Sequence, residues 1–341
     1  MLDKDAKVAG AFLQMTETET LRDSIQQLLP EHAGGVFETV TQASRTTARM
    51  LRDPGAPYVD AGTWGFWVQQ VAWGTSKDLG DTSEYDITGW GANGGAEIAL
   101  GGAGRIGASL SYLSGRDEGI NDSEVRTDQY ELAVHWRGQW GGFRSFARGS
   151  AASIKLDGTR QFSATVNGEE IRRTSSGEWD GRLYSAAAGI SYEAEFGRLS
   201  LRPLLAIDYY RLTEDGYTET GGGSAMDLVI DDRKSDEFAG EASLTLGYAF
   251  KAPTRKDDGF FRAEIEGGRR QILGGDVGAT TARFAGGTPF TLLPEKRTDG
   301  WTGKLRLIGG SGDFSIGGEV GAEEQQGRAA VSGRIALQIG F

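Results

Sequence analysis

The residues best suited to acid–base chemistry are Glu264 and Glu266. These two carboxylates are separated by one residue in a segment where apolar and polar residues alternate. Side chains two positions apart on a strand lie on the same face, roughly 7 Å from each other. Such a pair can act as acid and base in glycoside hydrolysis. We favour the simpler interpretation that both are counter-ions for a cation in an enclosed interior.

Other catalytic chemistries find little support. The 341 residues contain no cysteine, which excludes disulfides, thiolate zinc sites and cysteine nucleophiles. Only His32 and His135 are present, and no serine motif matches them, so we expect His135 to serve only as a hydrogen-bonding group. The net charge of −12 argues against a nucleic-acid partner. The sequence therefore predicts no enzyme: no catalytic residue, no cofactor and no metal site.

The elements that carry these residues are strands. From residue 62 onwards, apolar and polar residues alternate, most clearly where Ile335, Leu337, Ile339 and Phe341 share one parity at the end of the chain. The mean hydropathy is −0.38, and no run of 18 apolar residues occurs, so no transmembrane helix is expected. The alternation predicts twelve strands, at about 62–75, 84–100, 104–117, 127–141, 143–157, 179–196, 199–215, 237–251, 259–274, 297–310, 313–325 and 327–341.

The connections between these strands alternate between short turns and longer loops, an asymmetry typical of outer-membrane barrels. Loops are expected at 76–83, 118–126, 158–178, 216–236 and 275–296. Aromatic residues gather near both sets of connections, as at the two boundaries of a bilayer. Those expected near the short turns are Trp136, Trp140, Phe143, Phe196, Tyr248, Phe250, Phe260, Phe314 and Phe341; those expected near the long loops are Trp90, Tyr112, Tyr130, Trp179, Tyr209, Phe238 and Trp301.

A soluble sandwich or propeller would alternate in the same way. Its dry core would then have to accept the charged residues of the inner parity, at several kcal/mol for each unpaired charge. A membrane barrel with a polar lumen avoids this cost. The acids expected in that lumen are Glu97, Glu193, Glu241, Glu264, Glu266 and Glu319.

Residues 1–57 have a different character and are expected to be helical. A short piece over 20–29 ends at Pro30, and a second over about 34–52 is rich in small and hydroxylated residues. At 1.5 Å per residue the second helix is roughly 28 Å long. Arg45, Arg49 and Arg52 lie on one of its faces. We expect a helix adapted to a polar, enclosed lumen, with these arginines held by the lumen acids.

Several segments together resemble the C-terminal translocator domain of classical, type Va autotransporters. The resemblance covers about residues 20–341. The segments that carry it are LRDSIQQLLPE (21–31) with the small-residue helix, GTWGFW (62–67), DYYRL (208–212), DGYTETGG (215–222), LVID (228–231), and the alternating end at Phe341.

The resemblance implies an all-β fold, a twelve-stranded antiparallel transmembrane barrel with an N-terminal α-helix threaded through the pore. It implies residues 1–19 as a passenger remnant or a linker added upstream, 20–57 as a helical linker, and 58–341 as the barrel. Some family members cleave their passenger with a helix asparagine, but residues 1–60 contain none. No signal peptide opens the sequence, so we expect either a cytosolic protein or an excised part of a longer one.

The family further implies location in the bacterial outer membrane, with the long loops extracellular and the short turns periplasmic. Implied partners are outer-membrane lipid, periplasmic chaperones, the protein's own passenger, and the barrel-assembly machinery, which would read Ile335, Leu337, Ile339 and Phe341. A monomer is expected. Two alternatives stay open: a small-solute porin or other outer-membrane channel, and an outer-membrane hydrolase.

Overall fold

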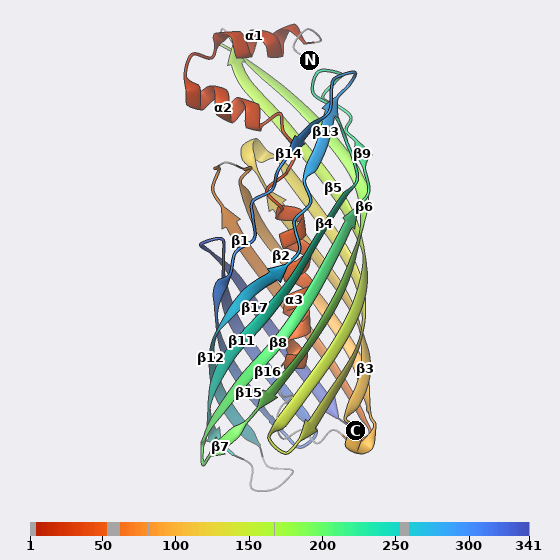
Figure 1. Cartoon of the computed structure of the whole chain (residues 1–341), viewed down its shortest axis with the longest axis vertical. Helices are drawn as coiled ribbons and strands as arrows, with labels where there is room; N and C mark the ends of the chain where they lie inside the picture. The colour runs from red at the N-terminus through yellow and green to blue at the C-terminus, as the bar shows by residue number, and fades with distance from the viewer. Residues whose placement is uncertain (1–4, 53–61, 81, 167, 253–258, 341) are drawn as a thin grey trace.

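The computed structural model describes residues 5–52, 62–80, 82–166, 168–252 and 259–340. Within these ranges, twelve antiparallel strands form a closed barrel, as predicted (Figure 1). In order around the barrel they are β1 (Trp64–Lys77), β2 (Tyr85–Ala99), β3 (Arg105–Glu118), β4 (Glu124–Trp140), β5 (Phe143–Val166), β6 (Glu169–Tyr192), β8 (Leu199–Glu214), β11 (Arg233–Lys251), β12 (Phe260–Gly274), β15 (Gly300–Ser311), β16 (Phe314–Gln325) and β17 (Arg328–Gly340).

The barrel closes between its first and last strands. β17 pairs with β1 in register, with Leu337 opposite Val68 and Ile335 opposite Gln70. Closure leaves no strand edge open, which is a requirement for a sheet in lipid. The short β7 (Ala194–Phe196) continues the line of β6 and pairs with β8. Phe341, the last residue of the predicted assembly signal, lies outside the described residues.

Side chains alternate between the outside and the lumen along every barrel strand. Large apolar residues such as Val68, Leu132, Leu205 and Ile265 are exposed on the outer face. Two expected outward aromatics were assigned wrongly: Trp179 and Phe260 are buried. Trp179 has the inward parity of β6 and stacks on Tyr217, with ring centroids 4.1 Å apart. No helix among the described residues is long and apolar enough to span a bilayer.

The two ends of the barrel differ. Tight connections join the strands at one end, the short-turn end, for example at residues 141–142 and 312–313. At the other, the long-loop end, the expected loop over 158–178 is wrong for most of its length. There β5 and β6 continue as a two-stranded hairpin that projects beyond the barrel (Figure 1). Polar residues are frequent in this segment. The sequence pattern of a strand with one neighbouring strand could not be distinguished here from that of a loop.

A second sheet stands on the long-loop end. It contains β9 (Tyr217–Thr218), β10 (Leu228–Ile230), β13 (Thr280–Phe284) and β14 (Phe290–Leu292) in the spatial order β14-β13-β10-β9. Leu228, Ile230 and Ala282 form its small core. Two short helical turns, η2 (Gly101–Ala103) and η3 (Ile120–Asp122), lie in barrel connections at opposite ends.

Three helices precede the barrel. α1 (Ala6–Gln14) and α2 (Thr18–Gln26) lie beyond the long-loop end, whereas α3 (Gly35–Arg52) runs inside the barrel (Figure 1). The position of α3 agrees with the predicted helix over 34–52, whereas α1 lies in the region expected to be helical but was not predicted as a separate helix. Every residue of α3 except Met50 and Arg52 is buried.

Candidate functional site: the pore and its helix

The composition of α3 suits a helix surrounded by a barrel wall. Its threonine hydroxyls donate to carbonyls of the preceding turn, as from Thr39 to Gly35 (2.8 Å), Thr41 to Phe37 (2.7 Å) and Thr46 to Gln42 (2.7 Å). These hydroxyls therefore need no partner from the wall. The small and hydroxylated side chains keep the helix narrow, and they leave few hydroxyl groups to be satisfied by the barrel.

The start of α3 is fixed by Glu31. Its Oε1 accepts hydrogen bonds from the backbone N–H groups of Gly34 (2.7 Å) and Gly35 (3.0 Å). A carboxylate at a helix N-terminus satisfies free N–H groups and complements the helix dipole. Gly34 has φ +96°, a conformation that favours glycine. The other carboxylate oxygen lies 3.5 Å from Nη1 of Arg233, which joins the helix start to β11.

The first turns of α3 pack into an apolar collar, a feature that the sequence did not predict. The collar consists of inward residues of β5, β6 and β8: Ile154, Leu156, Trp179, Leu183, Tyr210 and Leu212. Val36, Phe37 and Val40 of the helix contact it. The lumen wall formed by β5, β6 and β8 is thus apolar beside the first turns of the helix.

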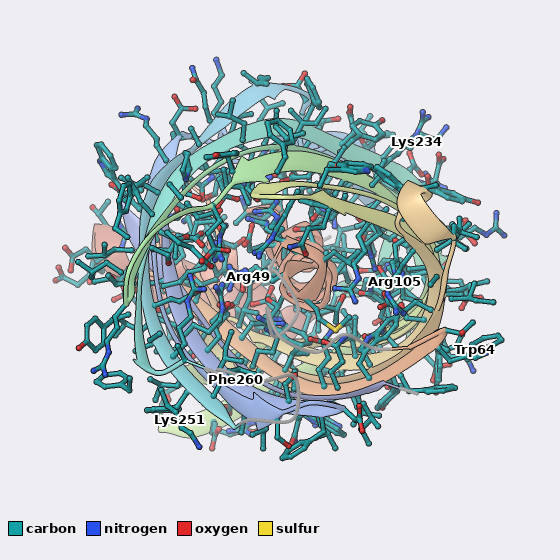
Figure 2. All side chains as sticks on the ribbon, turned by 90° about the horizontal axis from the view of Figure 1, so that it is seen from below. Arg49, Trp64, Arg105, Lys234, Lys251 and Phe260 are labelled. Atoms are coloured by element: carbon teal, nitrogen blue, oxygen red, sulfur yellow. The ribbon has the colours of Figure 1, made fainter. Side chains whose placement is uncertain are left out.

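The three predicted arginines of α3 each lie near a wall carboxylate. Arg45 Nη1 is 2.6 Å from Oε1 of Glu323. Arg49 Nη1 is 3.8 Å from Oε1 of Glu319 and also donates to Ser332. Arg52 donates to Glu241, and its Nη2 lies 3.3 Å from Oδ2 of Asp208. Figure 2 looks along the barrel and shows Arg49 beside the helix, inside the ring of strands.

Further polar contacts join α3 to other strands. Ser44 donates to Oε2 of Glu131 on β4 at 2.5 Å. Gln69 on β1 donates from Nε2 to the carbonyl oxygen of Thr47 at 2.9 Å. Glu38 accepts from Arg297, in the connection before β15. The helix is therefore held from several sides of the lumen, and not by its arginine face alone.

Four of the six predicted lumen acids contact cations of the wall and not of the helix. Glu264 pairs with Arg202 (2.9 Å), Arg262 (2.8 Å) and Arg306, and Glu266 pairs with Lys304 (2.5 Å). Glu193 contacts Arg144 (2.9 Å) and Arg262, whereas Glu97 contacts Arg105 (3.5 Å), Arg137 and His135. Glu264 and Glu266 are therefore counter-ions for cations in the lumen, but these cations belong to the wall and not to the expected arginine face of α3.

These wall contacts follow from strand register. Glu264, Arg306, Glu319 and Arg334 stand directly opposite one another on β12, β15, β16 and β17. Opposite charges at facing positions stabilise neighbouring strands. The four side chains are buried, so each charge neutralises the next in a line across the wall. We call this line the wall ladder.

The geometry offers no free pair for acid–base catalysis at Glu264 and Glu266, because both carboxylates bind cations. His135 lies 3.5 Å from Oε2 of Glu97 and in edge contact with Trp67. Over the described ranges, no group of three or more histidine, aspartate or glutamate side chains is arranged to hold a metal ion. The arrangement can hold a helix in a barrel by charge and shape.

Wall glycines provide the room that the helix occupies. A Cβ at Gly115 on β3 would overlap the methyl group of Thr39, and one at Gly321 on β16 would lie 3.2 Å from Nη1 of Arg49. Both helix residues are buried. The lumen is therefore matched to α3 at the level of single methyl groups.

We predict that Gly115→Leu displaces α3. Overfilling a packed site costs about 1–3 kcal/mol for small additions, and a leucine adds more. Hydrogen exchange of the α3 amides should quicken and the conductance of the barrel should rise. Gly267→Leu is the matched control, because Gly267 is exposed on the outer face with no atom within 4 Å of an added Cβ. Equal behaviour of the two variants would contradict the steric fit.

Residues 66–321 match the family described as the autotransporter beta-domain. The chain belongs to this family and is a translocator domain of the type Va class. It is accordingly an integral barrel of the outer membrane of a Gram-negative bacterium.

Similar proteins agree with this assignment. Esterase EstA of Pseudomonas aeruginosa is 26% identical over 238 residues, which cover 67% of this chain and 35% of that protein. An extracellular serine protease of Serratia marcescens is 21% identical over 229 residues, covering 63% of this chain and 21% of that protein. The chain thus spans about a third or less of these relatives. The translocator domain of the autotransporter NalP from Neisseria meningitidis shares the fold, with a TM-score of 0.64, 16% identity, and coverage of 89% and 98% of the two chains.

Proposed function

We propose that this barrel exports an N-terminal passenger to the cell surface and then anchors it there, with α3 remaining in the pore as a plug. The observation that carries the proposal is the path of the chain. β1 begins near the short-turn end, yet α1 and α2 lie beyond the long-loop end, and α3 connects the two sides through the lumen (Figure 1). Any residues preceding α1 would join it at the long-loop end.

The proposal includes an orientation and a mode of assembly. The long loops would face the cell exterior and the short turns the periplasm. Periplasmic chaperones and the barrel-assembly machinery would deliver and insert the chain as a monomer. Residues 1–19 and the helical linker over 20–57, which contains α3, would form the junction to the passenger, and residues 58–341 the inserted domain.

A reporter domain fused before Met1, behind a signal peptide, tests the proposal. Whole cells should display the reporter to an impermeant antibody, and protease added outside should remove it. The control is the same fusion lacking residues 300–341, which removes the last three strands and prevents closure. A reporter retained inside the cell by the intact barrel would contradict the export function.

We also propose that the barrel itself catalyses no reaction. The esterase and protease named above extend well beyond the matched region, and the lumen carboxylates here are paired with cations. The alternative of a barrel hydrolase would require hydrolysis by the purified chain. A panel of ester and peptide substrates should remain uncleaved.

Phe341 is proposed to act in assembly together with Ile335, Leu337 and Ile339. Burial of one such side chain is worth about 1.5–3 kcal/mol, which a twelve-stranded ladder can lose without unfolding. Phe341→Ala should lower the folded fraction in cells, while purified and refolded protein keeps heat-modifiable migration on gels. Equal defects in both settings would make the residue structural and not a signal.

A further inference from the structure

The hairpin of β5 and β6 leaves the barrel without a neighbouring strand. β4 accompanies β5 only as far as Thr159, and β8 accompanies β6 only from Gly181. Between these positions the two strands pair with each other, apart from one bridge between Ser176 and Thr220. An isolated two-stranded hairpin is marginally stable in water, so a projecting one needs a further surface to pack on.

That surface is provided by the residues that precede α3. Phe162 and Ile171 of the hairpin form a buried cluster with Val8 and Ala11 of α1 and with Leu28, just after α2. Ala225 and Met226, from the connection between β9 and β10, complete it. Phe12 of α1 stacks on Phe162 with ring centroids 5.7 Å apart. This group is separate from the apolar collar around α3.

Polar contacts also join the hairpin to the residues before α3, both at the start of α1 and just after α2. Asp5 accepts from Nε of Arg173 at 2.9 Å, and Nζ of Lys7 lies 2.5 Å from Glu169. Burial alone would raise the pKa of Asp5, but hydrogen bonds from Arg173 and the backbone N–H of Val8 hold this pKa below its ordinary value. Oε1 of Gln27, which follows α2, accepts from the backbone N–H of Ser163 at 3.0 Å.

Arg160 lies at the base of the hairpin, where these contacts converge. Its guanidinium donates to the carbonyl oxygens of Gln27 (3.2 Å) and Met226 (2.5 Å) and to Glu219 (2.5 Å). One buried side chain therefore joins the hairpin, the residue after α2 and the connection from β9 to β10. Such a set of directed bonds fixes one arrangement of the three segments.

We propose that the hairpin and the 219–228 connection form a docking surface for residues 5–28, which captures the chain as it leaves the pore and opposes its return. The proposal rests on the export function above. Its occupant is a segment of this chain, a pair of short amphipathic helices with an acidic residue at the start. Helices as short as α1 and α2 are only marginally stable alone, so they fold when they meet this surface. Folding on the far side of the pore gives export a direction.

Docking is tested with the purified full chain by trypsin cleavage after Lys7 and Arg22. Phe162→Asp places a charge in the buried cluster, and Val8→Asp does the same from the helix side. Cleavage should become at least about tenfold faster in both, since burial of one large apolar side chain is worth a decade or more in an equilibrium constant. Thr165→Asp is the matched control, because Thr165 is exposed on the same hairpin. Heat-modifiable migration verifies that each barrel is folded.

Unchanged cleavage in both cluster variants would overturn the docking surface. Capture during export is tested separately, by the time course of surface arrival of the fused reporter. The Phe162→Asp and Val8→Asp chains should deliver it several-fold more slowly than the Thr165→Asp chain. Equal arrival times despite faster cleavage would overturn the capture role. A parent chain that delivers no reporter would contradict the proposed export function, while the trypsin result would still decide docking.

Discussion

Deleting residues 1–57 should convert a nearly closed barrel into an open pore. The deletion removes α3, which runs inside the ring of strands (Figure 2) and is buried there over nearly its whole length. The interior of a twelve-stranded barrel is wider than that of an eight-stranded one, which side chains alone can fill. We expect single-channel conductance in planar bilayers to rise by about an order of magnitude or more on loss of the helix.

A shorter deletion separates the plug from the docked helices. Removal of residues 1–29 takes away α1 and α2 but keeps Glu31 and all of α3. Conductance should stay near that of the intact chain, because the apolar collar and the charged contacts of α3 remain. If the intact chain already conducts like an open porin, α3 does not act as a plug and the channel alternative gains support.

The number of strands could be predicted because each barrel strand has an outer face in lipid and an inner face in a polar lumen. As a result, apolar and polar residues alternate with a period of two wherever a strand contacts lipid. Where a strand extends beyond the bilayer, its outer face no longer has to be apolar. For this reason the sequence predicts a loop where the projecting part of the hairpin lies, with Phe162 and Ile171 covered by α1.

The arginine face of α3 was also predictable, since it depends only on helical spacing. The partners were not, because they depend on the stagger between strands and on the rotation of the helix in the lumen. Glu323, which pairs with Arg45, was absent from the predicted set of acids although it has inward parity. Glu264 was in the set, but the register places it opposite Arg306. Parity identifies which side chains face the lumen, whereas register decides which of them meet.

The same distinction explains the glycines and the collar. A high glycine content predicts curvature and space in general, but the need for glycine at Gly115 arises from one methyl group of Thr39. Apolar inward residues such as Leu183 and Leu212 form the collar only because β6 and β8 are adjacent beside the first turns of α3. Contacts between segments far apart in the sequence determine both features.

Reversing the charge of Arg52 should release the helix. Arg52→Glu would place a third carboxylate beside Asp208 and Glu241, which both contact the arginine now. Removing one partner of a buried ion pair costs about 3–5 kcal/mol, and reversal adds repulsion. Conductance should rise towards that of the chain lacking residues 1–57, and protease should gain access to α3. Arg22→Glu is the control, since Arg22 is exposed on α2 and, among the charged groups of the described residues, pairs with its neighbour Asp23.

The choice of partner makes the test specific. Glu241→Arg added to Arg52→Glu should restore low conductance, because the exchanged charges can pair again while Lys304 keeps Glu266. Glu264→Arg should fail to restore it, because Glu264 is bound by Arg202 and Arg306 and its reversal would also break the wall ladder. Low conductance should therefore be restored by Glu241→Arg and not by Glu264→Arg. Such non-additive effects of two substitutions are expected for residues in direct contact. If Arg52→Glu leaves conductance unchanged, lumen water screens the arginine, and steric fit alone holds the helix.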